Sequence, residues 1–190
     1  MERRTLLAGL AAGAAGATLA AGSALAQSAA PAPPLSDAAR AHVRDTMTAG
    51  AQSLAISRIA QAKLKHPMGK QFADFEVAEQ DGIADVLKSR MTPGVKPMGT
   101  IKAPTDAEVE ANLDAAGKEA VDKFRGMKEG PEFEKAYIQA EIDGHKKLLD
   151  IQDTYLKVAD DEDETNIAKL AKGRIQEHLT ILADIEKHLG

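Results

Sequence analysis

The segment PEFEKAYIQAEIDGHKKLLDIQDTYLKVA, residues 131–159, has the pattern of one long amphipathic helix. A proline at its first position suits the first turn of a helix, where the missing N–H costs no hydrogen bond. Apolar side chains then recur at helical spacing on one face: Phe133, Tyr137, Leu148 and Tyr155. Glu141 and His145 fall on this same face. The segment therefore predicts a helical protein in which polar side chains interrupt the apolar surface.

The remainder of the chain predicts helices of the same kind. Aromatic residues make up only 3% of the chain, Trp is absent, and Ala, Leu, Glu, Asp and Lys dominate, so the composition favours helices. Proline and glycine divide the sequence, and further helices are expected at about 37–65, 68–91, 105–128 and 160–188. Short connections make neighbouring helices antiparallel. We therefore expect an all-α protein, an antiparallel four-helix bundle with one additional helix.

Residues 1–26 have the features of a targeting signal. Arg3 and Arg4 precede an uncharged stretch rich in Ala and Gly, which ends in Ala24-Leu25-Ala26, a pattern typical of signal cleavage sites. The paired arginines predict a twin-arginine signal, which exports proteins that have already folded. An ordinary secretory signal and an uncleaved membrane anchor are the alternatives.

The rest of the chain is expected to form one domain after a short leader. Residues 27–36 are rich in Pro and Ala and are expected to be disordered. Residues 37–190 are expected to form the bundle domain. We expect a periplasmic or extracellular protein whose mature chain has no membrane span.

The composition excludes several classes of site and partner. The formal net charge is −5, so no basic field exists to attract the phosphates of a nucleic acid. The chain has no cysteine, which excludes disulfides, thiolate metal sites and iron–sulfur clusters. It also lacks a nucleophile elbow and a glycine-rich phosphate loop, and no catalytic residue is predicted. A protein partner and the oligomeric state stay open.

Residue counting places several ionisable side chains at one height of the bundle. His145 lies about 15 residues before the predicted turn at Asp160, and His178 about 18 residues after it, which separates them by about one helical turn. Glu79 lies near the middle of the 68–91 helix. Facing carboxylates and imidazoles are how helical bundles build iron or manganese sites. The candidate metal ligands are therefore Glu79 (or its neighbour Glu76), Glu141, His145 and His178.

Two interpretations of this layer remain open. It could hold one transition-metal ion in a mononuclear site with three or four ligands. Alternatively, each histidine could be satisfied by a neighbouring Glu or by Tyr137, and the layer would set helix register without binding anything. Arg174 shares the face of His178 and would pair with Glu141 or Glu177, or repel a cation. Three other histidines lie at helix or chain margins and are expected at the surface: His42, His66 and His188.

Four features of the sequence carry a family resemblance. They are the twin-arginine-like leader, Phe72-Ala73-Asp74-Phe75-Glu76, the spaced residues Phe133, Tyr137, Glu141 and His145, and the late His178. Over about 38–189 the chain resembles a ferritin-like bacterial envelope family, domain of unknown function 4142. The resemblance implies a ferritin-like up-down bundle and an exported location, and it supplies no established activity.

The chain departs from this family at two positions. Members commonly carry a glutamate in the first helix and a histidine in the second, where this chain has Ala55 and Gln80. The Glu-x-x-His pair of di-iron bundles is absent, so a standard di-iron centre is not expected. The sequence then predicts a non-enzymatic envelope protein that binds a partner or protects against stress. The alternative is a ferritin-like protein that binds mononuclear iron, manganese or zinc and has oxidoreductase activity.

Overall fold

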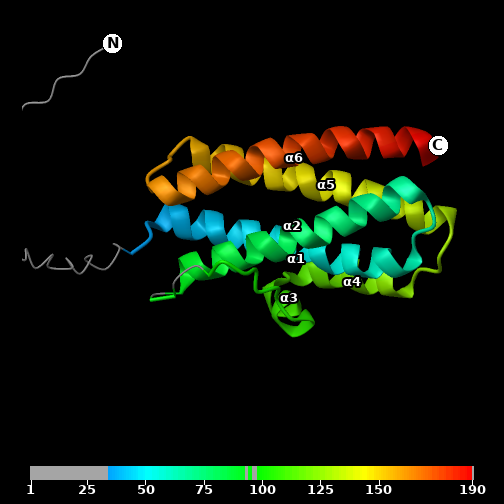
Figure 1. Cartoon of the computed structure of the whole chain (residues 1–190), viewed down its shortest axis with the longest axis horizontal. Coiled ribbons are helices and arrows are strands. Elements are labelled where there is room, and N and C mark those ends of the chain that lie inside the picture. Colours follow the sequence, from blue (N-terminus) through cyan, green and yellow to red (C-terminus); the bar gives the residue numbers. More distant parts are fainter. Residues whose placement is uncertain (1–33, 93, 96–97, 190) are drawn as a thin grey trace, which may run out of the picture. The chain divides into compact units, whose positions relative to one another are not determined.

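The computed structural model describes residues 34–92, 94–95 and 98–189, and all regular secondary structure in these ranges is helical. The all-α class predicted from the sequence is thereby confirmed. The predicted signal, residues 1–26, and most of the predicted leader, residues 27–36, lie outside the described residues. The helices are α1 (Asp37–Lys63), α2 (Pro67–Met91), α3 (Asp106–Asn112), α4 (Ala115–Gly126), α5 (Pro131–Leu156) and α6 (Glu162–Leu189) (Figure 1).

Local sequence signals set most of the helix ends. The Ser36 side chain accepts a hydrogen bond from the Ala39 N–H at 2.9 Å and caps α1. Leu64 is extended and ends α1 just before His66-Pro67, and Pro67 opens α2. Gly130, with φ of 137°, makes the turn before α5, a conformation that other residues rarely adopt.

The single helix expected at 105–128 is wrong, because the structure divides this segment into α3 and α4. Thr105 and Glu108 form the capping box that the sequence predicts. Leu113 then adopts an extended conformation and turns its side chain into the core. Asp114 starts α4 by accepting a hydrogen bond from the Gly117 N–H at 2.7 Å. Burial of one leucine and a new N-cap therefore outweigh the helix propensity of the segment.

The long helices α1, α2, α5 and α6 pack as antiparallel neighbours. Both α1 with α2 and α5 with α6 are hairpins with short connections, and α1 also packs along α5. Ion pairs join α2 to α6 at two levels, Arg90 with Asp163 and Glu79 with Arg174. Figure 1 shows these helices running lengthwise, with α3 and α4 beside α1.

The α3–α4 segment returns the chain from the end of α2 to the start of α5. Near the end of α2, Lys88 pairs with Glu108 at 2.6 Å. At the far end of α1, the Lys63 ammonium donates to the carbonyl oxygens of Phe124 and Met127 at 2.9 and 2.7 Å. Both short helices pack on α1, so they form a connection that runs along the second part of that helix.

The core consists of apolar clusters separated by polar side chains. The largest cluster includes Leu54, Phe72, Phe133 and Leu182. Two smaller ones follow toward the start of α1: first Ala49, Leu148 and Ile175, then Ala39, Tyr155 and Ala168. Within the described ranges, no helix is both long and apolar enough to cross a bilayer.

Candidate metal centre

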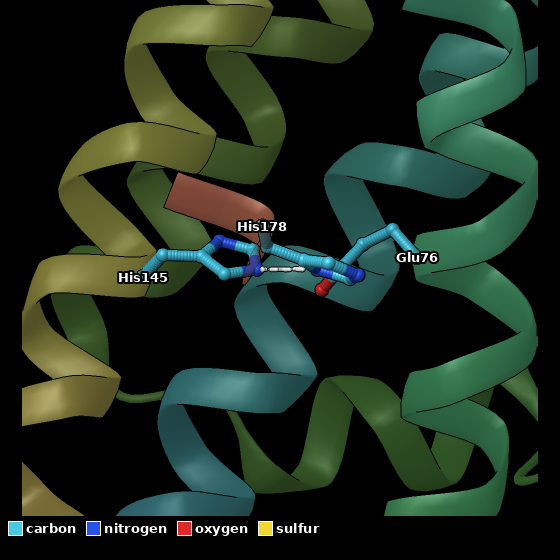
Figure 2. A group of neighbouring side chains, drawn as sticks. All are labelled: Glu76, His145 and His178. Carbon is cyan, nitrogen blue, oxygen red and sulfur yellow. Dashed lines mark hydrogen bonds and ion pairs between the residues drawn. The ribbon is translucent and has the colours of Figure 1, made fainter. Parts of the chain in front are cut away.

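Three buried side chains from three helices meet between two of the apolar clusters, the one that contains Leu182 and the one that contains Ile175. Glu76 comes from α2, His145 from α5 and His178 from α6, and each is at most 1% exposed. The Nε2 atom of His145 lies 3.0 Å from Nδ1 of His178. Glu76 Oε2 lies 3.0 Å from that Nδ1 and 3.4 Å from His145 Nε2. Figure 2 shows the three side chains directed toward one another.

The outer nitrogen of each imidazole determines which atom faces the centre. His145 Nδ1 lies 2.8 Å from the backbone carbonyl oxygen of Glu141, which can only accept, so Nδ1 carries a proton. His178 Nε2 lies 3.4 Å from a carboxylate oxygen of Glu79, which favours a proton on that nitrogen as well. Neutral imidazoles in these tautomers direct both remaining lone pairs at Glu76 Oε2.

Three lone-pair atoms at this separation repel one another unless a proton or a metal ion lies between them. Among the described residues, Glu76 Oε2 has no hydrogen-bond partner although it is buried. One proton on His145 Nε2 can be donated to His178, but it cannot satisfy all three atoms. A tetrahedral ion with bonds of about 2.0–2.1 Å holds its ligand atoms roughly 3.3–3.4 Å apart, close to the distances found here. The geometry therefore suits a small transition-metal ion.

A hydrogen-bonded chain supports the other face of Glu76. Ser53 Oγ lies 2.7 Å from Glu76 Oε1 and 2.6 Å from Glu141 Oε2, and the Gln80 amide donates to the same Glu76 oxygen at 2.9 Å. Beyond Glu141, Ser57 lies 3.1 Å from its carboxyl group and 2.9 Å from the Tyr137 hydroxyl. The Ser53 hydroxyl has a single proton and can donate it to only one of the two carboxyl groups. Every hydrogen bond is therefore made when Glu141 is protonated and donates to Ser53, while Ser53 donates to Glu76.

The ionisation of these groups follows from burial and from their mutual charges. Burial, together with the negative charge of Glu76, raises the pKa of Glu141 to about 8. Burial also opposes the charge on Glu76, but the imidazoles of His145 and His178 outweigh it and hold its pKa well below the usual range. Burial lowers the pKa of His145, and its contact with Glu76 more than reverses this and raises the pKa to about 9. The metal-free centre thus combines a carboxylate, an imidazolium and a neutral acid.

The four predicted ligands are distributed over the centre and its surroundings. His145 and His178 meet as the residue count predicts. Glu79 lies behind His178, on its outer nitrogen. Glu141 lies behind His145, with 3.6 Å between its Oε2 and the outer Nδ1. The carboxylate that faces both imidazoles is Glu76, which the sequence offered only as the alternative to Glu79.

Arg174 stays outside the centre. Its guanidinium donates to Glu79 at 2.6 Å and to Glu177 at 2.8 Å, and its side chain is 43% exposed. The predicted pairing with Glu177 is confirmed. The other partner is Glu79, and not Glu141 as the sequence suggested. Arg174 therefore orients the carboxylate behind His178 and does not place its own charge in the centre.

Sequence reasoning missed the serines of α1. Ser53 and Ser57 are buried, and they are four residues apart on the helix face toward α5. The i, i+4 spacing of these small polar residues could have indicated that they share one helix face. An isolated serine pair on a helix is common, however, and suggests no partner by itself. Gln80, a departure from the family pattern, donates a hydrogen bond to the central carboxylate.

A close approach between α1 and α2 makes the position of Gln80 testable. A Cβ atom at Gly50 would lie 2.5 Å from the Gln80 side-chain oxygen. Gly50→Ala is therefore expected to displace Gln80 from Glu76 and to lower the free energy of unfolding by about 1 kcal/mol. In a Gln80→Ala background the same change should instead stabilise by up to about 1 kcal/mol, because Ala is the better helix former. Urea unfolding of the wild type, the two single variants and the double variant measures this coupling, and additive effects would contradict it.

The expected surface position of His42 is wrong. His42 is 3% exposed and stacks on Tyr155 with 4.5 Å between ring centroids. Its Nδ1 lies 2.6 Å from Glu164 Oε1, and its Nε2 lies 2.7 Å from Gln152 Oε1. Arg90 contacts the second Glu164 oxygen at 3.3 Å. These residues form a second polar layer in which both imidazole nitrogens have partners.

The other two histidines expected at the surface differ from each other. His188 is exposed as expected, and His66 is half-buried.

Fold and centre together define an all-helical protein with a carboxylate and two imidazoles buried in its core. The family described as domain of unknown function DUF4142 matches residues 24–185, and the chain belongs to this family. Neither a curated protein nor a solved structure matches the chain.

Proposed function

We propose that this protein binds one divalent transition-metal ion, iron, manganese or zinc, through Glu76, His145 and His178. The observation that carries the proposal is the convergence of three buried ligand atoms on one point, with Glu76 Oε2 left without a hydrogen bond by the described residues. Hydrogen bonds or close contacts to the outer atoms already orient each ligand, as in known metal sites.

The donor set indicates the class of chemistry. Two imidazoles and one carboxylate are ligands of catalytic zinc sites and of non-haem iron(II) sites. Three protein ligands leave at least one coordination position for water or substrate, whereas structural zinc sites use four. We therefore infer a reactive rather than a purely structural ion, which supports an oxidoreductase role if iron or manganese is bound.

The proposal includes a ferritin-like bundle in the cell envelope. Its four helices are α1, α2, α5 and α6, and α3 with α4 would be the long crossover that returns the chain between the two hairpins. The metal ligands then come from three of the four bundle helices. Residues 1–26 would export the folded protein through the twin-arginine route to the periplasm or the medium.

A non-enzymatic envelope protein is the second candidate. It is favoured by the raised pKa of His145, because an imidazolium beside Glu76 neutralises the buried carboxylate without a metal. The polar layer would then only fix the alignment of the helices, and function would lie in binding a partner or in protection against stress.

Metal content distinguishes the two candidates. Mature protein, exported natively and purified without a histidine tag or chelator, is expected to contain about one ion of iron, manganese or zinc per chain. The double variant His145→Ala, His178→Ala should contain none, as measured by mass spectrometry of the metals. Substoichiometric metal in both proteins, with no thermal stabilisation when each metal is added back, would leave the non-enzymatic candidate.

A further inference from the structure

A cavity of about 280 Å³ lies between α1 and α5 and reaches the polar side chains behind the centre. Its lining includes Gln52, Ser53, Glu141, Asp143, Gly144 and Lys147. Asp143 and Lys147 are exposed, whereas Ser53 and Glu141 are buried, so the cavity leads from the surface inward. It has room for several water molecules.

The inner end of this cavity is one side chain away from the metal ligands. Ser53 Oγ lies 2.7 Å from the Oε1 atom of Glu76. The Glu141 carboxyl lies 3.6 Å from the ring of His145. A cation that reaches Ser53 and Glu141 therefore needs only small side-chain movements to contact Glu76.

The other cavities beside the centre suit a hydrated cation less well. The one between α2 and α6, of about 570 Å³, is lined by apolar side chains such as Val86, Ile101 and Leu170. Its polar contact with the centre is Glu79, which Arg174 covers and which faces the outer nitrogen of His178. A third cavity touches Gln80, but Met47, Leu54 and Leu87 line much of it. Shedding water against apolar surface is costly for an ion, whereas carboxyl and hydroxyl oxygens replace that water.

We propose that the cavity between α1 and α5 is the route by which the metal ion and its water ligand reach the centre. Ser53 and Glu141 form an oxygen-lined subsite at its inner end, where the ion exchanges water for protein ligands before it binds Glu76, His145 and His178. Asp143 attracts the ion at the mouth, where the ammonium group of Lys147 lies 4.0 Å from a carboxylate oxygen of Asp114 that offsets its charge. This inference rests on the proposed function.

Gly144 allows the route to be closed with little disturbance of the fold. A Cβ atom at Gly144 would meet no atom of the described residues within 4 Å, and the residue lines the cavity. Gly144→Leu therefore places an apolar side chain at the mouth. Gly173→Leu is the matched control, because Gly173 is also a helical glycine with open space at its Cβ, and it lies in α6 away from this cavity.

Stopped-flow loading of the full mature protein with Co²⁺, followed by visible absorption, tests the route. Gly144→Leu is expected to slow both association and dissociation at least about tenfold at unchanged affinity. A blocked route raises the barrier to exchange but leaves the free energies of the metal-free and metal-bound proteins unchanged. Gly173→Leu should load as the wild type does. Equal rates for all three proteins would overturn the proposed route and leave the metal site standing. No Co²⁺ uptake by the wild type would overturn both proposals.

A charge change provides a second test that does not depend on filling the cavity. Asp143 is exposed, and its described hydrogen bond comes from the neighbouring Gln139 side chain. Asp143→Lys should slow Co²⁺ association several-fold at low salt, and the difference should disappear near 1 M salt, where charges are screened beyond about 3 Å. The same change at Asp184, an exposed residue of α6, is the control. Equal slowing by both variants would mean that net charge, and not this mouth, sets the rate.

Discussion

Glu76→Gln is expected to abolish tight binding of a divalent metal ion while the protein stays folded. The amide has nearly the shape of the carboxylate, but it brings no negative charge and is a weak ligand for transition metals. Its nitrogen can also donate a hydrogen bond to the lone pair of His178 Nδ1, which is 3.0 Å from the present oxygen. The variant therefore satisfies without a metal the atoms that the wild type directs at an ion.

Glu79→Gln is the matched control, since the two glutamates are three residues apart on α2. Of the three proposed ligands Glu79 contacts only His178, at its outer nitrogen. This variant should therefore lose roughly 10- to 100-fold in affinity, as is typical when a residue that orients a ligand is removed. Titration with Zn²⁺ against a competing chelator measures both variants. A larger loss in Glu79→Gln than in Glu76→Gln would mean that Glu79 is the ligand, as the sequence first suggested.

The free energy of unfolding of the metal-free protein is expected to fall by roughly 4–5 kcal/mol between pH 6.5 and 9. The pKa of His145 is raised from 6.5 to about 9, so its stabilising charge is fully present below pH 6.5 and is lost as the pH rises through 9. The pKa of Glu141 is raised from 4.5 to about 8, so its neutral form stabilises the fold at low pH and this contribution is lost by about pH 8. Both changes have the same sign.

Urea unfolding in the presence of a chelator, at intervals across this pH range, measures the decline. Glu141→Gln should flatten it below pH 8, because the amide retains a donor for Ser53 and does not titrate. Metal affinity should change in the opposite direction, since the ion displaces the proton of His145 and binds more tightly as the pH rises. Stability that stays constant or rises toward pH 9 in the metal-free protein would contradict the assignment of an imidazolium beside Glu76.

Most of the helices could be predicted because their ends depend on neighbouring residues. Ser36 caps α1, Pro67 opens α2, and Pro131 opens α5, all within one turn of the helix that each begins. The break at Leu113 could not be predicted in this way. Its neighbours Asn112 and Asp114 favour caps and turns, but no proline marks a break there. The core on which Leu113 packs makes the extended conformation favourable.

The heights of the site residues could be predicted, but not the rotation of α2 about its axis. Phe72 and Phe75 together suggest an apolar face that lies between them and includes Glu79. In the structure α2 is turned toward Phe72, which is 2% exposed, and away from Phe75, which is 51% exposed. This rotation places Glu76, one turn after Phe72, in the core. Pairs as distant as His42 and Glu164 are likewise invisible to local patterns, because their partners are decided by tertiary packing.

The alternation of apolar clusters and polar layers along the helices restricts how the protein can move. Many helical proteins change state when packed helices slide past one another by a fraction of a turn. Here such shear would carry His178 or Glu164 from its buried partners into an apolar cluster, and an unpaired buried charge is strongly destabilising. If the protein binds a metal ion as proposed, uptake and release would therefore occur within a rigid frame, by rotamer changes of side chains such as Ser53 and Glu141. Exchange of the ion should then not require the helices to separate.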